Sequence, residues 1–455
     1  MRNKTKLRKW GFLVLFLIFS LSVFLGGETP VVGSEKSIKT VRFLCMAGPA
    51  GRKYTTVFKE FEKYGMRVIV DQVPWTTYLE KASLAVQAPK SRYDVIDANV
   101  EWVLPGWVVG NKVFPLNEFV EKTNFDLNDF FPLLLANVYW DKDQKYKPDG
   151  LFWDWENGLL YAIPSMPGTT PLCYRRDWFI NAAIPGPPKS WDEFLTYAKK
   201  LTVDLNGDGT IDRWGYAYAS APVGGQLTDY WMLFLRSWGA SIFDEQFEPA
   251  FNNKKGIGAT QFMVDLYRKY KVVPPGVPTY GIPQAFDAYK KGKVAMCTQW
   301  ANALASVEDP SESVAAGKTG YAIPPIKEQM GARVGNFAYA IPVNVPDPEL
   351  SWKFIQLASS YEVQKKLLPE IAASRKSVLD YIDEYFADTY LVPMNKIMLG
   401  ETAALKPQIP NILEVDADMA YPVYDAITGK KTVKEALKEA ERKVYETMKK
   451  AGFYK

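Results

Sequence analysis

The sequence predicts a two-lobed α/β protein, each lobe built on a mostly parallel sheet flanked by helices. A chain of 455 residues is too long for one hydrophobic core, which points to more than one lobe. Apolar segments of strand length alternate with segments of helix length over residues 41–99, a pattern typical of βαβ units. The polar stretch at 141–150 then separates this region from a second series of strands and helices.

The first lobe begins with three predicted strands and two helices between them. The strands are VRFLC (41–45), MRVIVDQV (66–73) and YDVIDAN (93–99), and the helices are KYTTVFKEFEKYG and YLEKASLAVQA. In a parallel sheet, ligands bind beyond the carboxyl ends of the strands. The residues that follow each strand are therefore candidate ligand contacts.

The remaining segments are recognised by their periodicity and by their capping residues. Ser190 with Glu193, and Thr432 with Glu435, have the spacing of a capping box at the start of a helix. Trp191 and Trp352 fall within helical segments, where we expect core positions. Further strands are predicted in GLLYAIP (158–164), TTPLCYRRDWF (169–179), WGYAYA (214–219), KVAMCTQW (293–300), GYAIPPI (320–326) and NFAYAIPVN (336–344).

The composition is that of a folded protein, with several function classes excluded. Apolar residues make up 47% of the chain and charged residues 23%, which argues against disorder. The chain has no histidine, so histidine-based triads, zinc sites and imidazole acid–base chemistry are excluded. Its 14 tryptophans and 26 tyrosines provide many aromatic rings outside a clean apolar period.

The first 34 residues have the pattern of an export signal. A basic start precedes the apolar run GFLVLFLIFSLSVFL (11–25), and the small-residue pattern Val32-Gly33-Ser34 follows it. We therefore predict a signal peptide at 1–34 and a periplasmic or cell-surface protein, with an uncleaved membrane anchor as the alternative. This segment carries the whole net charge of +4. The rest of the chain is near neutral, so nucleic-acid binding is not expected.

The three cysteines lie in apolar, strand-like runs. Cys45, Cys173 and Cys297 follow or lie within VRFLC, TPLCY and VAMC. Such positions predict buried free thiols. One disulfide between two of them is the alternative that an exported location allows.

The stretch DLNGDGTIDRWG at 204–215 has the oxygen spacing of a calcium-binding loop. Gly209 stands at the sixth place for the sharp turn, but Gly215 occupies the twelfth place, where an EF-hand has a bidentate Glu. We therefore expect no sensor-type opening, and leave a structural calcium ion and a plain turn as alternatives. The candidate metal ligands are Asp204, Asn206, Asp208, Thr210 (through its backbone carbonyl) and Asp212.

Five stretches, taken in order, resemble the extracellular solute-binding proteins of ABC importers, in the family that includes maltose-binding protein. Each stretch is weakly specific alone, but together they run over nearly the whole chain after residue 34. They are DVIDANVEW (94–102), GLLYAIPSMPGTTPLCYRRDWF (158–179), PPKSWDEFLTYAKKLT (187–202), KKGKVAMCTQWANA (290–303) and ITGKKTVKEALKEA (427–440).

The resemblance implies a periplasmic-binding-protein-like fold, with a solute in the cleft between two lobes joined by hinge crossovers. It implies an N-terminal lobe of 35–156 with about 322–362, and a C-terminal lobe of 157–321 with about 363–455. Ligand binding then closes the lobes by hinge motion, and the permease subunits of an ABC importer recognise the closed form. We further expect a monomer that requires no cofactor.

The resemblance and the chemistry of sugars together suggest a set of contacts. Sugars present apolar C–H faces to aromatic rings and hydroxyl groups to carboxylates or amides. Trp231 and Trp300 match two stacking tryptophans of the maltose-type site, and Trp75 follows another strand end. The expected ligand-binding residues are Trp75, Glu101, Trp102, Trp231, Trp300 and Asp416.

Several alternatives stay open at this point. The number of tryptophans favours a di- or oligosaccharide, but a polyol, a sugar phosphate or a peptide are further solutes. The stretches MAGPAG (46–51) and WDWEN (153–157) depart from the family pattern and are candidates for the selectivity of this protein. A role in sensing is a further alternative. A secreted glycosidase with paired carboxylates is the alternative from another class, with Asp97, Glu101, Asp154 and Glu156 as candidates.

Overall fold

The computed structural model describes residues 38–141, 158–400 and 403–454. The predicted signal peptide at 1–34 and the stretch WDWEN at 153–157 lie outside the described residues. Within the described ranges, no helix has the length and apolar character needed to cross a membrane.

The first sheet has five strands in the order β2-β1-β3-β11-β6. β1 pairs in parallel with β2 and β3, whereas β11 runs antiparallel to β3 and β6. The three predicted strands of residues 41–99 are thus confirmed. The strands are β1 (Lys39–Met46), β2 (Met66–Val73), β3 (Val95–Asn99), β6 (Ile163–Thr169) and β11 (Val334–Ala340).

The second sheet has four strands in the order β10-β7-β9-β8 and, like the first, it is mixed, with one strand running opposite to the others. β8 and β9 are parallel, but β7 is antiparallel to both of its neighbours. A parallel pair needs a crossover of about a dozen residues or more, usually helical, and β8 and β9 are separated by three helices. β7 instead begins directly after β6 of the first sheet. The strands are β7 (Leu172–Arg175), β8 (Trp214–Ala217), β9 (Val294–Thr298) and β10 (Thr319–Ala322).

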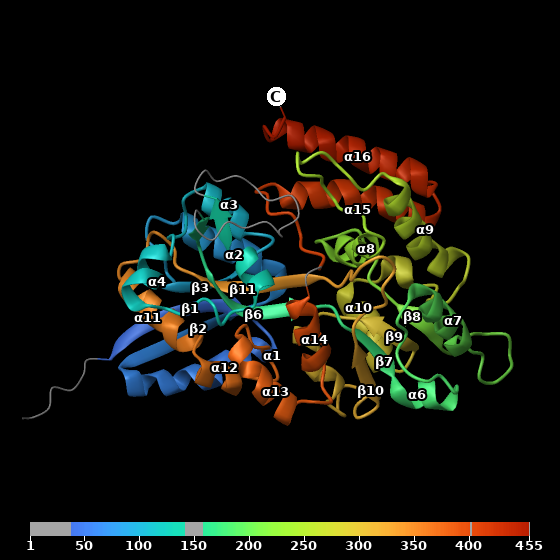
Figure 1. The fold of residues 1–455 in the computed structure, drawn as a ribbon, viewed down its shortest axis with the longest axis horizontal. Helices are drawn as coiled ribbons and strands as arrows, with labels where there is room; N and C mark the ends of the chain where they lie inside the picture. Colours follow the sequence, from blue (N-terminus) through green and yellow to red (C-terminus); the bar gives the residue numbers. More distant parts are fainter. Residues whose placement is uncertain (1–37, 142–157, 401–402, 455) are drawn as a thin grey trace, which may run out of the picture. The chain divides into compact units, whose positions relative to one another are not determined.

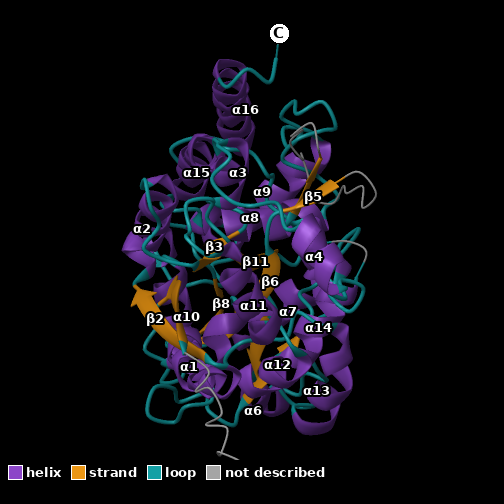
Figure 2. Ribbon diagram, turned by 90° about the vertical axis from the view of Figure 1, so that its left-hand side faces the viewer, coloured by secondary structure: helices purple, strands orange, loops and turns teal. Residues whose placement is uncertain are grey.

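Helices flank both sheets (Figures 1 and 2), and β4 (Tyr139–Asp141) pairs with β5 (Gly158–Leu160) in a small additional sheet. The predicted lobe boundaries at 156/157 and about 362/363 stay predictions. They assign β6 and α14 to the C-terminal lobe, but β6 pairs within the first sheet and α14 contacts β6. The helices are α1 (Pro49–Phe58), α2 (Trp75–Gln87), α3 (Leu104–Val109), α4 (Asn117–Thr123), α5 (Pro132–Ala136), α6 (Arg176–Asn181), α7 (Trp191–Leu201), α8 (Gln226–Ser237), α9 (Lys254–Arg268), α10 (Ile282–Lys290), α11 (Pro348–Ala358), α12 (Tyr361–Leu367), α13 (Leu379–Tyr385), α14 (Leu391–Leu399), α15 (Ile412–Thr428) and α16 (Val433–Lys450).

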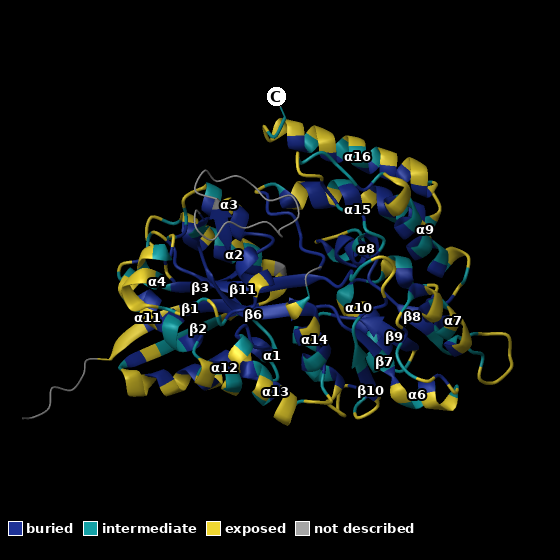
Figure 3. Ribbon diagram, in the orientation of Figure 1, coloured by how far each residue is buried: buried dark blue, intermediate teal, exposed yellow. Residues whose placement is uncertain are grey.

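The last helix illustrates how the sequence determines an element. Thr432 Oγ1 accepts the backbone N–H of Glu435, and the Glu435 carboxylate accepts the N–H of Thr432, so the predicted capping box is confirmed. Such a cap contributes about 1 kcal/mol. One stripe of α16 is buried against the molecule and the other face is exposed (Figure 3), as the periodicity requires. The buried stripe consists of Val433, Ala436, Leu437, Ala440, Val444 and Met448.

Aromatic residues pack against one another within the largely aliphatic core around both sheets. Phe43 of β1 packs edge-on against Tyr54, with ring centroids 5.3 Å apart. Trp191 lies beside Phe234 at 4.8 Å. Trp191 and Trp352 are 1% and 2% exposed, which confirms both as core residues.

All three cysteines are buried and free, as expected. Cys173 of β7 and Cys297 of β9 are register partners on adjacent antiparallel strands. Burial raises the pKa of the Cys45 thiol and of the Cys297 thiol. These groups are therefore held in the unreactive thiol form.

Candidate functional site

A cavity of about 740 Å³ lies among residues from both sheets and their flanking helices. Three strands end at it, since Met46, Asn99 and Gln299 lie at or directly beyond the ends of β1, β3 and β9. α8 and α10 contribute Asp229 and Phe286 from the second-sheet side. The volume falls in the range of small-molecule sites, and the position agrees with the strand-end rule.

Aromatic rings form much of the cavity wall. Trp102 is 9% exposed and Trp300 is half-buried, whereas Trp75 is 40% exposed. Trp75 also packs edge-on against Phe337, with ring centroids 6.3 Å apart. Flat rings on several sides are suited to the apolar faces of a solute.

Two glycines let the indole rings lie close to the backbone. A Cβ on Gly225 would overlap the ring of Trp102, and its φ of 75° is in the left-handed region. A Cβ on Gly335 would lie 3.2 Å from both the Trp300 ring and the Glu101 carboxylate. Gly225 therefore requires the absence of a side chain, whereas a Cβ on Gly335 would be tightly packed.

Amide side chains supply hydrogen-bonding groups to the cavity. Asn99 Oδ1 accepts the backbone N–H groups of Glu101 and Trp102 at 3.1 and 3.0 Å, which fixes the turn after β3. Asn336 is 3% exposed, and its Nδ2 has no hydrogen-bond partner among the described residues. A buried donor without a partner is costly, so Asn336 is a candidate donor to a bound solute.

A buried charge network lies beside the cavity and reaches it through Glu101 and Asp229. Arg333 Nη2 donates to both oxygens of Glu101 at 2.7 and 2.8 Å, and it lies 3.3 Å from Asp229 Oδ1. Lys406 Nζ lies 3.1 Å from Asp229 Oδ1 and 3.0 Å from Asp416 Oδ1. These five residues, whose side chains are all less than a tenth exposed, are called the buried charge network below.

The network holds the arginine in its charged form. Burial alone lowers the pKa of Arg333, but the charges of Glu101 and Asp229 outweigh this effect and raise it. The Arg333 guanidinium also lies 5.6 Å from the centroid of the Trp300 ring. The arginine of the buried ion pairs thus lies close to an aromatic residue of the cavity wall.

Four of the six predicted ligand-binding residues line this cavity, namely Trp75, Glu101, Trp102 and Trp300. The structure places Trp231 elsewhere. Its side chain is wholly buried, its indole N–H donates to Thr260 Oγ1 at 2.8 Å, and its ring packs on Phe251. The residues of α8 that line the cavity are Gln226 and Asp229. Asp229 is two positions before Trp231 and therefore about 200° away around the helix.

Asp416 does not line the cavity either. Its carboxylate accepts from Lys406 and from Thr228 Oγ1, so it lies one residue behind Asp229. Its place in the network gives it an electrostatic influence on the cavity without contact with a solute.

Sequence reasoning missed several lining residues. Asn99 and Gln299 follow strand ends, so the rule that found Glu101 and Trp300 would also have found them. Arg333 and Lys406 of the buried charge network, which do not line the cavity, were missed as well. They follow no strand end, and both pair with Asp229, which is more than 100 residues away from each. Only the folded chain brings them together.

The loop at 204–212 is closed by its own backbone. Asp204 accepts the N–H groups of Gly207 and Gly209 at 2.8 and 2.7 Å, and Asp208 accepts that of Thr210 at 2.7 Å. These hydrogen bonds, with that from Gly209 the strongest for Asp204, lower the pKa of both carboxyls. Among the described residues, no group of three or more His, Cys, Asp or Glu side chains could hold a metal ion. The structural calcium ion stays a prediction.

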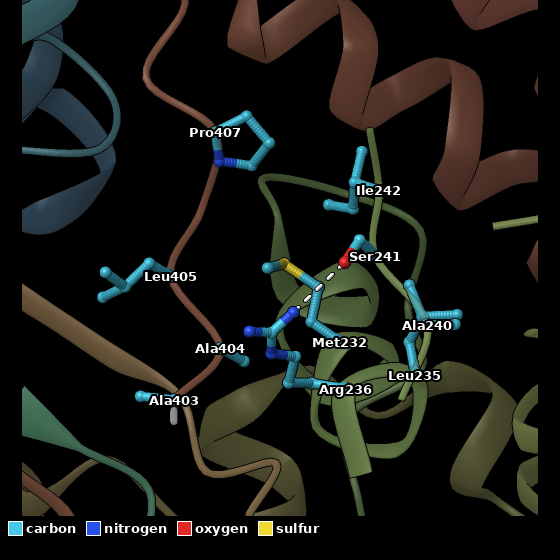
Figure 4. A pocket seen from close by; sticks show the side chains of 10 residues that line it. All are labelled: Met232, Leu235, Arg236, Ala240, Ser241, Ile242, Ala403, Ala404, Leu405 and Pro407. Atoms are coloured by element: carbon cyan, nitrogen blue, oxygen red, sulfur yellow. Dashed lines mark hydrogen bonds between the residues drawn. The ribbon is translucent and has the colours of Figure 1, made fainter. Parts of the chain in front are cut away.

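A second, very small cavity lies between α8 and the segment that precedes α15 (Figure 4). Its volume is about 20 Å³, close to that of a single water molecule. Arg236 donates across its edge to Ser241 Oγ at 3.1 Å. It is too small for a solute.

The carboxylates considered for a glycosidase do not form a catalytic pair among the described residues. Asp154 and Glu156 lie outside these residues. Asp97 is fully buried beneath the cavity wall, and this burial raises its pKa to about 7. Both oxygens of Glu101 accept hydrogen bonds from Arg333.

Known proteins are similar to this chain along most of its length. The sequence matches the family model described as bacterial extracellular solute-binding protein over residues 48–365. A mannitol-binding protein of Pseudomonas aeruginosa is 24% identical over 326 residues, which cover 66% of this chain and 71% of that protein. A probable ABC transporter-binding protein of Deinococcus radiodurans is 23% identical over 390 residues, which cover 84% and 86%.

Solved structures share the fold. Maltose-bound MalE3 of T. maritima has a TM-score of 0.75 at 22% identity, covering 90% of this chain and 99% of that chain. A solute-binding protein of Thermotoga lettingae with bound α-D-tagatose has a TM-score of 0.73 at 24% identity, with the same coverage. One from Agrobacterium vitis with bound D-mannitol has 0.71 at 23% identity, covering 91% and 100%.

These similarities confirm the predicted α/β binding-protein fold. The proteins of this family bind solutes and do not transform them, so the alternative of a secreted glycosidase is wrong. Because the family model matches well over half of its length, the chain belongs to the family of bacterial extracellular solute-binding proteins.

Proposed function

We propose that this protein is the extracytoplasmic solute-binding component of an ABC importer and that it binds a carbohydrate of two or more units in the 740 Å³ cavity. The observation that carries the proposal is the combination of three tryptophans with amide and carboxylate groups around one cavity. Aromatic rings stack on the C–H faces of sugars, and the polar groups receive their hydroxyls.

The cavity size supports a solute larger than one sugar unit. Trp102 is buried, Trp300 is half-buried and Trp75 is exposed, so a ligand that contacts all three reaches from buried to exposed parts of the wall. The similar proteins bind a range of polyhydroxyl compounds, including maltose, D-tagatose and D-mannitol. Polyols therefore belong in the same test.

Delivery to a membrane permease follows from the proposed role. The solute closes the two sheets about the cavity, and the permease subunits of the importer bind the closed form, whereas a receptor partner would indicate sensing. The protein acts as a monomer in this scheme and needs no cofactor.

The experiment is a thermal-melting screen of the purified chain with mono-, di- and trisaccharides and polyols. A ligand that binds only the folded state at a hundred times its Kd stabilises it by about 2.7 kcal/mol. We expect a rise in Tm with di- or oligosaccharides and a loss of this rise in Trp300→Ala. Tyr445→Ala, on the exposed side of α16, is the matched control.

Two results would contradict the proposal in different ways. A larger rise in Tm with single sugars or polyols than with every oligomer would contradict the proposal that the ligand has two or more units. An unchanged Tm with every polyhydroxyl compound would contradict carbohydrate binding and would indicate a peptide or another solute.

A further inference from the structure

The buried charge network has one more negative charge than positive charge. Three carboxylates share two cations, and no other described cation lies within ion-pair distance of them. The carboxylates are Glu101, Asp229 and Asp416, and the cations are Arg333 and Lys406.

This excess charge is poorly screened by water. The side chains of Arg333 and Lys406 are 0% and 1% exposed, and that of Asp229 is 9% exposed. Charges in such surroundings interact several times more strongly than charges in water. A neutral solute that covers Asp229 would displace the water that solvates its carboxylate, and it would supply no positive charge in place of that water.

Asp229 is the place where the cavity meets this charge. Its Oδ1 receives both cations, at 3.3 Å from Arg333 and 3.1 Å from Lys406. Its Oδ2 has no hydrogen-bond partner among the described residues. A donor on the solute can therefore reach a carboxylate oxygen that the protein leaves available.

The two buried cations are not available to an anionic solute. Lys406 Nζ lies between Asp229 and Asp416 and faces the ring of Trp102 at 3.7 Å. Arg333 donates to Glu101, Asp229 and the carbonyl of Ala404. Both cations are buried and paired with carboxylates of the protein, and Arg333 Nε, which has no partner among the described residues, is buried too.

The remaining charged side chains at the cavity lie nearer to solvent, so they interact more weakly with a charged solute. Lys290 lies 3.8 Å from Asp287 and 3.3 Å from Glu312, and Lys291 lies 3.4 Å from Asp287, so the charges of this group balance. Arg52 is a positive charge at the wall, but it is exposed. Exposed charges are screened by water and salt.

We propose that the cavity selects carbohydrates that carry an amine, such as amino sugars or amino polyols, over their neutral and acidic counterparts, with the ammonium group at Asp229. This inference rests on the proposed function, because it names the class of carbohydrate that the same cavity takes.

The test uses ligands that differ only in charge. One series is D-glucitol, 1-amino-1-deoxy-D-glucitol and D-gluconate, and a longer series is maltitol, 1-amino-1-deoxymaltitol and maltobionate. The dissociation constant of each is measured by calorimetry with the purified full chain at pH 7. We expect the amine to bind about tenfold more tightly than the neutral compound, and the acid about tenfold more weakly.

A charge-neutralising variant tests the cause. Asp416→Asn removes the excess charge one residue behind the cavity wall, so the ratio of neutral to amine dissociation constants should fall towards one. Asp418→Asn is the matched control, because it makes the same charge change on α15 at a residue that bonds Thr447 instead. Circular dichroism of both variants confirms that they fold.

The outcomes separate this inference from the proposed function. If the neutral compounds bind and the amines bind no better, the inference is overturned while carbohydrate binding stands. An unchanged ratio in Asp416→Asn overturns it as well. If no member of either series binds, the inference is overturned, whereas the carbohydrate proposal is decided by the wider thermal-melting screen.

Discussion

Lys406 Nζ lies 3.7 Å from the centroid of the Trp102 ring and also contacts Asp229 and Asp416. A single buried ammonium group thus joins the wall of the cavity to two carboxylates. The aromatic face supplies part of the solvation that water would otherwise give to this cation.

Removal of this ammonium group should be strongly destabilising. Lys406→Met leaves Asp229 and Asp416 buried without their shared cation, and loss of one partner from a buried ion pair costs about 3–5 kcal/mol. Lys430→Met is the matched control, since Lys430 lies over Tyr424 at the surface and pairs with Asp425. Urea unfolding of both variants measures the difference. Equal, small effects would show that the buried network contributes little to stability.

Gly225 should tolerate no side chain. In Gly225→Ala the new Cβ meets the Trp102 ring, so either the ring or the start of α8 must move. Gly224→Ala is the control, because Gly224 also has a positive φ but nothing lies near its Cβ position. Both variants carry backbone strain of about 1 kcal/mol. We expect Gly225→Ala to lower the free energy of unfolding by at least about 1 kcal/mol more, and equal losses would exclude the ring contact.

Asp97 should make the folded protein less stable as the pH rises. Burial raises its pKa from 3.8 to about 7, and the hydrogen bond from Ser165 only partly opposes this. The folded state therefore holds a proton that the unfolded state releases near pH 4. The cost of ionisation is absent below pH 4, grows between pH 4 and 7, and reaches roughly 4 kcal/mol above that range.

Asp97→Asn isolates this contribution, because an asparagine oxygen can still accept the bond from Ser165. The difference in the free energy of unfolding between this variant and the unaltered protein is measured from pH 4 to 8. We expect the variant to gain relative stability as the pH rises. A difference that does not vary with pH would contradict the raised pKa.

The thiols should be unreactive in the folded protein. Cys45, Cys173 and Cys297 are buried, so an aromatic disulfide reagent should release no colour until denaturant is added and should then report three thiols. A count of one thiol in denaturant would instead indicate a disulfide between two of the cysteines. Cys173 and Cys297 are the register partners that such a bond would join.

The loop at 204–212 should keep its shape without calcium, because its carboxylates already accept backbone N–H groups. We expect the Tm to be the same in calcium and in a chelator, and Asp204→Ala to lower it in both. A rise in Tm with calcium that is lost in Asp204→Ala would establish the structural ion.

The strand-end rule explains how much of the cavity could be predicted from sequence. Glu101 and Trp102 follow β3, and Trp300 follows β9, so the rule placed them at the cavity. Whether they contact a solute stays a prediction. The rule does not apply within a helix, where one position changes the direction of a side chain by about 100°. Trp231 was suggested by the resemblance to the maltose-type site, and it does not line the cavity, while Asp229 was missed.

Long-range pairing is the part that local patterns could not supply. The capping box at Thr432 depends on four consecutive residues, and it was predicted and confirmed. The antiparallel direction of β7 depends on how the chain enters from the first sheet. The pairing of Glu101 with Arg333 joins residues 232 positions apart. Neither the direction of β7 nor the pairing of Glu101 with Arg333 can be predicted from the residues next to them in the sequence.

Arg333 brings three connecting segments of the chain side by side. Its backbone N–H donates to Thr170 Oγ1 at 2.9 Å, and its carbonyl accepts the N–H of Thr170. Thr170 lies in the segment between β6 and β7. Arg333 also forms a β-bridge with Ala404, between α14 and α15. A rotation of one sheet relative to the other would bend the chain at these connecting segments. Displacement grows with distance from such a bend, so Arg333 and its partners would move less than exposed lining residues such as Arg52 and Glu312.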